Sequence, residues 1–138
     1  MDIRIAAMED LTPLSQLDGH IRPQELRHAV AEGRVLLAEE QGRVVGWLRW
    51  GLFWDSVPFL NMLYVLDGER RRGVGQRLMA RWEAQMRALG HNLVMTSTAA
   101  DEYAQHFYHK LGYETVGGFF HRDDPYELIL SKRLADGQ

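Results

Sequence analysis

Residues Gly68 to Trp82 read "GERRRGVGQRLMARW", and this stretch carries the clearest periodic pattern in the chain. Three consecutive arginines precede a Gly-Val-Gly tripeptide that starts at Gly73. Apolar residues then recur every three or four positions, as in an amphipathic helix: Val74, Leu78, Trp82, Met86 and Leu89. Arg87 and Gly90 are typical of a helix C-terminus. The pattern therefore predicts a helix that begins directly after a turn of arginine and glycine.

This arginine–glycine turn, residues 70–76, has the composition of an anion-binding site. A helix N-terminus leaves about four backbone N–H groups without partners and carries a partial positive charge. Gly73 and Gly75 let the backbone approach a bulky anion, so the amides of residues 71–76 can point at one phosphate group. On the turn alone, phosphate binding and a plain solvated loop remain alternative interpretations.

The other periodicities predict a single mixed α/β domain over residues 1–138. After a first short strand, apolar residues on either side of a break at 19–23 predict two short helices. Three strands then form an antiparallel meander, with turns at Gln41-Gly42 and at Asp55 to Pro58. After the long helix, the remaining elements are a strand at 91–98, an amphipathic helix at 100–111, and strands at 113–120 and 125–131. The predicted order is β-α-α-β-β-β-α-β-α-β-β.

The composition excludes several classes of protein. The 138 residues carry a net charge of −3 and include no cysteine. The lack of cysteine excludes a disulfide scaffold, a thiolate nucleophile and thiolate zinc sites. The slight acidity argues against a general binder of nucleic acids or anionic membranes, because such proteins neutralise many phosphates. We see no leader-like segment and no apolar run near the roughly 20 residues that span a bilayer, so we expect a cytoplasmic protein. We also expect no metal.

A second motif, "AQHFYHKLGY" at Ala104 to Tyr113, follows the arginine–glycine turn. Together the two motifs resemble the GNAT superfamily of N-acetyltransferases. Its first motif is Arg or Gln, two residues, Gly, one residue, then Gly or Ala, which matches residues 70–75; its second is A-x-x-F-Y-x-K-x-G-F, in which Tyr113 replaces the usual phenylalanine. The resemblance is good from about Phe59 to Tyr113. It implies a central, mostly antiparallel sheet of about seven strands with a splayed parallel pair, flanked by about four helices.

The resemblance also implies a cofactor and the residues that bind it. In that family acetyl-coenzyme A lies where two parallel strands splay apart, and its pyrophosphate contacts the arginine–glycine turn. The backbone of residues 62–65 would hydrogen-bond the pantetheine arm, and the amide of Val65 would polarise the thioester carbonyl. The implied cofactor-binding residues are Met62, Leu63, Tyr64, Val65, Arg70, Arg71, Arg72, Gly73, Val74, Gly75, Gln76, Asp101, Ala104, Phe107, Tyr108 and Lys110.

Three residues of the second helix region have alternative interpretations. Tyr108 matches the family tyrosine that protonates the departing thiolate of coenzyme A, and its helical spacing also fits a packed core residue. Lys110 is a candidate for binding the cofactor's 3′-phosphate, and solvation at a helix end explains it as well. Asp101 stands where the family commonly has asparagine. It can accept a bond from the pantetheine N–H or stabilise the helix N-terminus.

The resemblance implies direct transfer of an acetyl group to a primary amine of a small-molecule or peptide acceptor. Many members use a glutamate on the strand before the turn as the base, whereas "FLNMLYV" offers only Asn61 as a polar residue. Candidate bases by residue type are Asp55, His20, His28 and His121. The alternative is a non-catalytic module that binds or senses acyl-coenzyme A, which needs no base. A homodimer is compatible with this fold, on which dimers are common.

Six aromatic residues occupy strands expected near the acceptor: Trp47, Trp50, Phe53, Trp54, Phe119 and Phe120. Alternation along a strand places Trp50 and Trp54 on one face and Trp47 and Phe53 on the other, so one pocket cannot hold them all. A cation–π cage for an amine is one interpretation. Core packing is the other, because aromatic residues dominate core burial.

Overall fold

The computed structural model describes residues 1–135, so the last three residues of the predicted domain lie outside the described part. By its contacts the chain divides into two compact units. The first unit comprises Met1–Gly51 and Met62–Trp82, and the second comprises Leu52–Asn61 and the chain from Glu83 onward.

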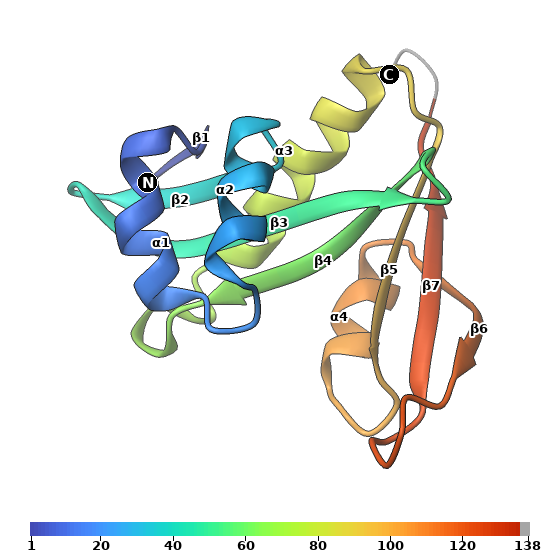
Figure 1. Ribbon diagram of the computed structural model, residues 1–138. Coiled ribbons are helices and arrows are strands. Elements are labelled where there is room, and N and C mark those ends of the chain that lie inside the picture. Colours follow the sequence, from blue (N-terminus) through green and yellow to red (C-terminus); the bar gives the residue numbers. More distant parts are fainter. Residues whose placement is uncertain (136–138) are drawn as a thin grey trace. The chain divides into compact units, whose positions relative to one another are not determined.

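The described residues form seven strands, four α-helices and two short 3-10 helices (Figure 1). In chain order these are β1 (Asp2–Ile5), η1 (Met8–Asp10), α1 (Leu11–Leu17), α2 (Pro23–Ala31), β2 (Val35–Glu40), β3 (Arg43–Phe53), β4 (Val57–Val65), η2 (Asp67–Glu69), α3 (Val74–Ala88), β5 (Leu93–Ala99), α4 (Ala104–Lys110), β6 (Glu114–Phe119) and β7 (Glu127–Arg133). Apart from the two 3-10 turns, this is the predicted order.

The seven strands within residues 1–135 form a sheet in the order β1-β2-β3-β4-β5-β7-β6. β4 and β5 are parallel, with Phe59 opposite Met95 and Leu60 opposite Thr96. The pairs β1–β2, β2–β3, β5–β7 and β6–β7 are antiparallel. The predicted mixed α/β fold, with a mostly antiparallel sheet, one parallel pair and four helices, is therefore confirmed.

In the first unit, helices cover both faces of the strands (Figure 1). Trp47 of β3 belongs to a core cluster with Leu14 of α1 and Leu26 of α2, so these two helices cover one face. Its neighbour Gly46 faces the other side of the sheet. A Cβ added to Gly46 would lie 3.1 Å from Val74 Cγ1 at the start of α3. Successive strand residues alternate between faces, so β3 contacts α1 and α2 on one side and α3 on the other.

Two groups of ion pairs hold the helices of the first unit to its strands. Arg4 of β1 binds both oxygens of Asp10 at 2.8 Å and both oxygens of Glu39 at 3.0 and 3.1 Å. The fully buried carboxylate of Asp18, at the end of α1, accepts bonds from Arg49 Nε at 2.9 Å and from Trp47 Nε1 at 3.2 Å. The connection from α1 to α2 is thereby fixed on β3.

The turn between β3 and β4 differs from the prediction. Its hydrogen bond joins the Ser56 N–H to the Phe53 carbonyl at 3.1 Å, and Trp54 and Asp55 both adopt left-handed backbone angles. Two left-handed central residues make the tight loop that suits a hairpin twist, so β4 begins before Pro58 and the predicted extent of the turn is wrong. Trp54 lies beyond β3 and is 80% exposed, so strand alternation does not place it.

The other tryptophans of β3 are core residues. Trp47 stacks on Tyr64 with ring centroids 5.1 Å apart, and Trp50 packs against Trp82 of α3. Core packing is therefore the correct interpretation for Trp47 and Trp50.

In the second unit, β7 lies between β5 and β6, and α4 packs along β5 (Figure 1). Both α3 and α4 end at a glycine with a left-handed backbone, Gly90 at φ 91° and Gly112 at φ 97°. After α3, the His91 N–H bonds the Met86 carbonyl at 3.0 Å, and α4 closes in the same way. The predicted C-terminal role of Gly90 is confirmed, because glycine adopts this conformation without a steric penalty.

Candidate functional site

The backbone of the arginine–glycine turn is shaped by two left-handed residues. Arg71 has φ 67° and Gly73 has φ 78°. The N–H of Arg77 donates to the Gly73 carbonyl at 3.0 Å, so α3 begins directly after Gly73. The backbone amides just before Arg77 are therefore those of a helix N-terminus. A Cβ on Gly73 would meet no heavy atom within 4 Å, so the space beside this residue is open. The turn therefore combines free space with N–H groups suited to an anion.

Arg72 stabilises the turn itself. One side of its guanidinium donates to Glu69 of η2, and the other donates to Glu40 at the end of β2 at 2.9 Å. Glu69 also accepts a bond from Arg43 at 2.9 Å. Hydrogen bonds to Glu40 and Glu69 raise the pKa of Arg72 above its usual value. Much of the positive charge noted in the sequence is thus compensated by carboxylates that connect the turn to the β2–β3 hairpin.

Arg70 and Arg71 differ in their surroundings. Arg70 donates from Nε to the Val65 carbonyl at 3.0 Å, and its guanidinium lies 5.3 Å from the centre of the Tyr64 ring. It also pairs with Asp67 at 3.3 Å. Arg71 is exposed and, within the described part of its own unit, has no ion pair. Of the three arginines, Arg71 has the side chain best placed to supply charge to a bound anion.

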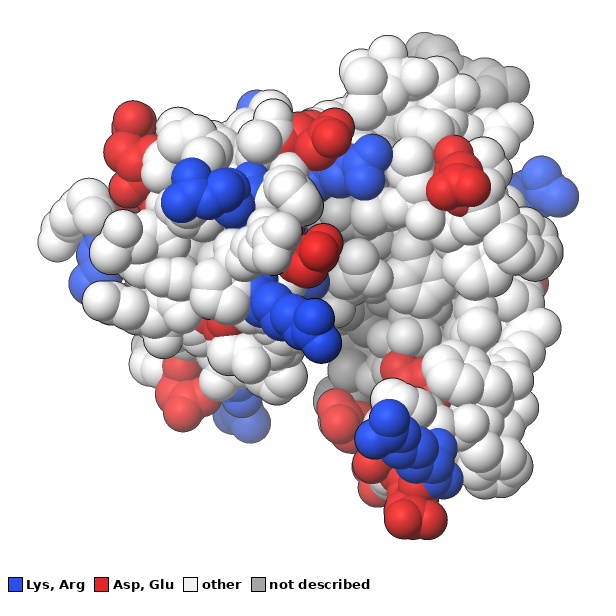
Figure 2. All heavy atoms as spheres, viewed as in Figure 1, with Lys and Arg blue, Asp and Glu red and all other residues white. Residues whose placement is uncertain are grey.

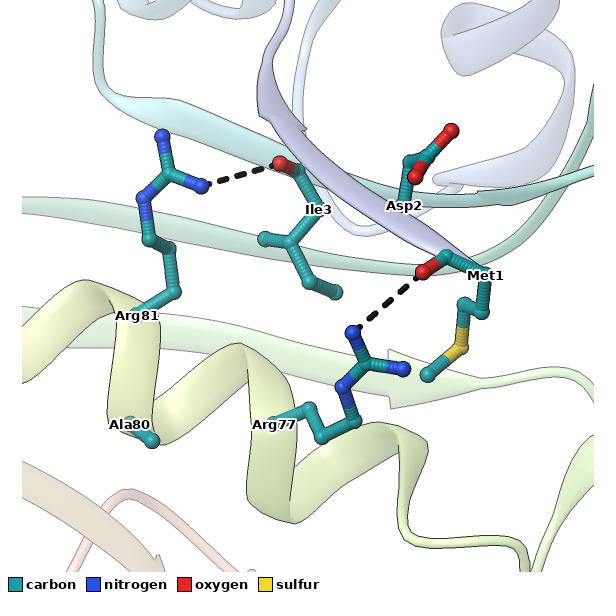
Figure 3. Close-up of a pocket in the computed structure, with 6 residues that line it drawn as sticks. All are labelled: Met1, Asp2, Ile3, Arg77, Ala80 and Arg81. Carbon is teal, nitrogen blue, oxygen red and sulfur yellow. Dashed lines mark hydrogen bonds between the residues drawn. The ribbon is translucent and has the colours of Figure 1, made fainter.

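α3 is held at the edge of the sheet by two further arginines (Figure 3). Arg77 donates to the Met1 carbonyl at 3.3 Å, and Arg81 donates to the Ile3 carbonyl at 3.0 Å. Asp2 lies on the other side of β1 from both arginines (Figure 3). These contacts line a groove of about 300 Å³ that contains no predicted site residue. Its arginines therefore anchor the helix that starts at the turn.

The predicted pantetheine strand, residues 62–65, lies in the same unit as the turn. Met62 and Tyr64 pack against the core under α1 and α2. At the end of the strand, the Leu66 N–H bonds the Val45 carbonyl at 2.9 Å, which holds the chain on β3 as it enters the turn. Tyr64 links the strand to the turn because its ring contacts both Trp47 and Arg70.

Tyr108 is buried in the second unit, with 7% of its surface exposed. Burial raises the pKa of Tyr108 to about 12, and a hydrogen bond with the Thr96 side chain opposes this rise. The Thr96 hydroxyl in turn donates to the Leu60 carbonyl at 3.1 Å. Leu60 and Thr96 face each other in the parallel pairing of β4 with β5, so the Tyr108 hydroxyl lies beside the two parallel strands.

The other predicted residues of the second motif occupy α4 and the turn before it. Ala104 begins α4, and the half-buried ring of Phe107 packs against Tyr108 with centroids 5.3 Å apart. Asp101 is exposed in the turn before the helix, and Lys110 is exposed at its last residue. This exposure agrees with both alternatives for Asp101 and Lys110, which are a contact with the cofactor and a local role at a helix end.

The sequence did not single out the polar neighbours of Tyr108. Thr96 and Thr98 are both buried, at 2% and 8% exposure, on the same face of β5. The sequence does contain an indication of these buried hydroxyls, because the two threonines alternate along a strand and so share one face. A buried hydroxyl needs a hydrogen-bond partner, which marks such positions as candidates for a polar site. Tyr113 donates to Glu83 at 2.9 Å across 30 residues of sequence, and no local pattern predicts that pair.

The candidate bases lie in local surface environments. His20, His28 and His121 are 63–73% exposed, and each lies 3.7–4.0 Å from a carboxylate within three residues in sequence. Asp55 is exposed in the β3–β4 turn.

Across residues 1–135, no group of three or more His, Cys, Asp or Glu residues could hold a metal ion, and no helix is long and apolar enough to cross a membrane. Figure 2 shows acidic and basic side chains interspersed on the visible face.

Residues 4–113 match the family model described as the acetyltransferase (GNAT) family. The chain belongs to this family. The match includes both motifs, and it confirms the family that they indicated. No curated protein matches the GNAT chain.

Solved structures share the GNAT fold at low sequence identity. Ard1 from Thermoplasma volcanium has a TM-score of 0.84 and 17% identity, with 98% of each chain covered. The PaiA N-acetyltransferase from Thermoplasma acidophilum, in complex with coenzyme A, has a TM-score of 0.80 and 16% identity, covering 96% of this chain and 98% of that one. An aminoglycoside 6′-N-acetyltransferase complexed with coenzyme A has a TM-score of 0.79 and 17% identity, covering 100% and 99%.

Proposed function

We propose that this GNAT protein acts as a single domain that transfers an acetyl group from acetyl-coenzyme A to a primary amine. Transfer is direct, within a ternary complex. The observation that carries the proposal is the position of Tyr108, which is buried on α4 where that helix packs along β5, the strand that pairs in parallel with β4. The coenzyme A complexes of proteins with this fold support the choice of donor.

In this proposal the arginine–glycine turn binds the pyrophosphate chiefly through its backbone. The amides of residues 71–76 supply the donors, and Gly73 leaves open space for the anion. Arg71 adds an exposed charge, whereas Arg70 and Arg72 hold the turn in shape through Val65, Glu69 and Glu40. In this proposal two of the three arginines therefore shape the anion site, and the third supplies charge to the anion.

The remaining cofactor residues follow from the two motifs. We assign the backbone of Met62, Leu63, Tyr64 and Val65 to the pantetheine arm, with the Val65 amide polarising the thioester carbonyl. On the second motif, Ala104 and Phe107 offer apolar contact, Asp101 accepts a bond from an amide N–H, and Lys110 pairs with the 3′-phosphate.

Tyr108 stabilises the leaving group in this mechanism. A C–N bond forms as the C–S bond breaks, the electron pair moves to sulfur, and the amine loses a proton. The pKa of Tyr108, about 12, exceeds that of a thiol near 8.5 by roughly 3.5 units, or about 5 kcal/mol. Tyr108 therefore donates a strong hydrogen bond to the thiolate and keeps its own proton for most of the time, and the proton released by the amine finally neutralises the sulfur.

The acceptor is a small-molecule or peptide amine in this proposal. β4 carries no glutamate, so proton removal from the amine relies on water or on a group outside that strand. The net charge of −3 favours a cationic acceptor over an anionic one. A homodimer is the oligomeric state that we propose, and sedimentation of the purified protein tests it.

Calorimetric titration with acetyl-coenzyme A, dephospho-coenzyme A and ATP tests the proposal first. We expect saturable one-site binding that prefers acetyl-coenzyme A, and no binding would overturn the proposal. Release of free thiol is then followed with a panel of amines, and the protein adds no background because it has no cysteine. Binding without thiol release from any amine would support the sensing module instead.

Tyr108→Phe tests the assigned role of the hydroxyl. We expect turnover to fall about 100-fold, the usual loss when one preorganised hydrogen-bond donor to the developing charge is removed, while cofactor affinity stays within about twofold. A wild-type rate would remove Tyr108 from the mechanism.

A further inference from the structure

A buried polar cluster lies at the C-terminal end of α4. Glu83 of α3 is 6% exposed. Its two carboxylate oxygens accept bonds from the Tyr113 hydroxyl at 2.9 Å and from Lys132 Nζ of β7 at 2.8 Å. Arg87, one turn further along α3, lies 3.9 Å from the same carboxylate. The Glu83 cluster, residues 83, 87, 113 and 132, thus joins α3 and β7 to Tyr113, three residues beyond the end of α4.

Tyr113 contacts Tyr108 directly. Its N–H donates to the Tyr108 carbonyl at 3.0 Å, which closes the last turn of α4. Its ring packs against the Tyr108 ring with centroids 5.8 Å apart and an interplanar angle of 63°. Tyr113 is only 2% exposed, and Lys132 Nζ lies 5.7 Å from the centre of its ring. Tyr113 therefore has little freedom to move, and Tyr108 packs against it.

We propose that Tyr113 is a positioning residue for Tyr108: the hydrogen bond from its hydroxyl to Glu83 fixes the ring against which the Tyr108 phenol is oriented. The inference rests on the proposed role of Tyr108 at the leaving thiolate. It concerns the hydroxyl specifically, because a phenylalanine at 113 would keep the ring contact and lose the bond to Glu83.

The chemistry of the cluster suits a permanent hydrogen bond. Burial and the neighbouring Glu83 carboxylate raise the pKa of Tyr113 well above its usual value, so the hydroxyl stays a donor at any working pH. Lys132 holds the second oxygen of Glu83, which prevents the carboxylate from turning away. Lys132 also lies beside Gly112, where a Cβ would be in ordinary van der Waals contact with Lys132 Cε at 3.4 Å.

The test measures the pKa of the thiol of bound coenzyme A, so it needs no amine acceptor. Thiolate formation is followed by ultraviolet absorbance, with acetyl-coenzyme A as the blank because it has no free thiol. The protein contributes no thiol of its own. Four proteins are compared: wild type, Tyr108→Phe, Tyr113→Phe and the double variant.

A hydrogen bond from Tyr108 stabilises the thiolate, so Tyr108→Phe should raise the thiol pKa by about one pH unit. Tyr113→Phe should raise it by about 0.3–0.5 unit, because the phenol is still present but less well aligned. In the Tyr108→Phe background, Tyr113→Phe should add nothing. A structural effect alone would shift the thiol equally in both backgrounds.

Two further variants separate positioning from loss of stability. Val94→Ala removes buried methyl groups from β5 and should lower the unfolding temperature while leaving the thiol pKa unchanged. Glu83→Gln leaves one oxygen for two donors, the Tyr113 hydroxyl and Lys132 Nζ, so it should raise the thiol pKa by no more than Tyr113→Phe does.

The outcomes distinguish the positioning role of Tyr113 from the proposed role of Tyr108. If Tyr108→Phe shifts the thiol pKa but Tyr113→Phe does not, the positioning role is overturned and the function of Tyr108 stands. The same holds if Tyr113→Phe acts equally with and without the Tyr108 hydroxyl. If Tyr108→Phe itself causes no shift, the proposed role of Tyr108 is wrong, and the inference is overturned with it.

Discussion

Gly46 of β3 provides a sharp test of how the arginine–glycine turn is positioned. A Cβ at this residue would lie 3.0 Å from the Tyr64 carbonyl oxygen, 3.1 Å from Val74 Cγ1 and 3.5 Å from Leu78 Cδ1. Val74 is the first residue of α3 and follows Gly73 of the turn. Gly46→Ala therefore pushes the start of α3 away from the sheet.

The size of the effect follows from these contacts. Carbon atoms in contact prefer about 3.5–4.0 Å, so the neighbours must move by roughly 0.5 Å. Adding a methyl group to a packed core costs about 1–3 kcal/mol, and we expect the free energy of unfolding to fall by about 2 kcal/mol. Misalignment of two or three turn amides should weaken coenzyme A binding by about 1 kcal/mol, or roughly fivefold.

Urea unfolding followed by tryptophan fluorescence measures the first quantity, and calorimetry with coenzyme A measures the second. Gly68→Ala is the matched control, since a Cβ there meets no heavy atom within 4 Å and its backbone angle is ordinary. The control should keep both stability and affinity. If Gly46→Ala lost stability but bound coenzyme A normally, the packing of Val74 on β3 would not set the anion site, and this reasoning would be refuted.

Three further predictions concern single residues. Asp18→Asn leaves the buried guanidinium of Arg49 without its carboxylate and should lower the free energy of unfolding by about 3 kcal/mol in urea titrations; a loss below about 1 kcal/mol would contradict the buried ion pair. The hydrogen bond from Arg4 lowers the pKa of Asp10, so this pair should stabilise the protein fully above about pH 5 and progressively less as the pH falls below the unfolded value of 3.8. Asp10→Asn should flatten that part of the stability curve, and an unchanged acid slope would exclude the pair as its source. Gly75→Val should weaken coenzyme A binding at least tenfold by crowding the turn, whereas unchanged calorimetric affinity would reject the phosphate assignment.

Local patterns in the sequence predicted most elements of the fold. The apolar period from Val74 to Met86 predicted α3, and Gly90 predicted its end, because helix periodicity and a left-handed cap depend on neighbouring residues. Leu89, the last member of the predicted period, lies beyond the helix and is exposed. The β3–β4 turn was misplaced because non-glycine residues rarely adopt the left-handed conformation that Trp54 and Asp55 have here.

For the candidate site, the sequence alone determined the family through two short motifs, and with it the predicted role of Tyr108. The tertiary structure alone decided what the three arginines contact: Arg72 binds Glu40, which lies 32 residues earlier in the chain. It also decided that the Tyr113 hydroxyl meets Glu83 across 30 residues. A periodic pattern of apolar residues indicates which face of a helix or strand a residue occupies. It carries no information on which distant side chain completes a hydrogen bond, because that depends on how separate elements pack.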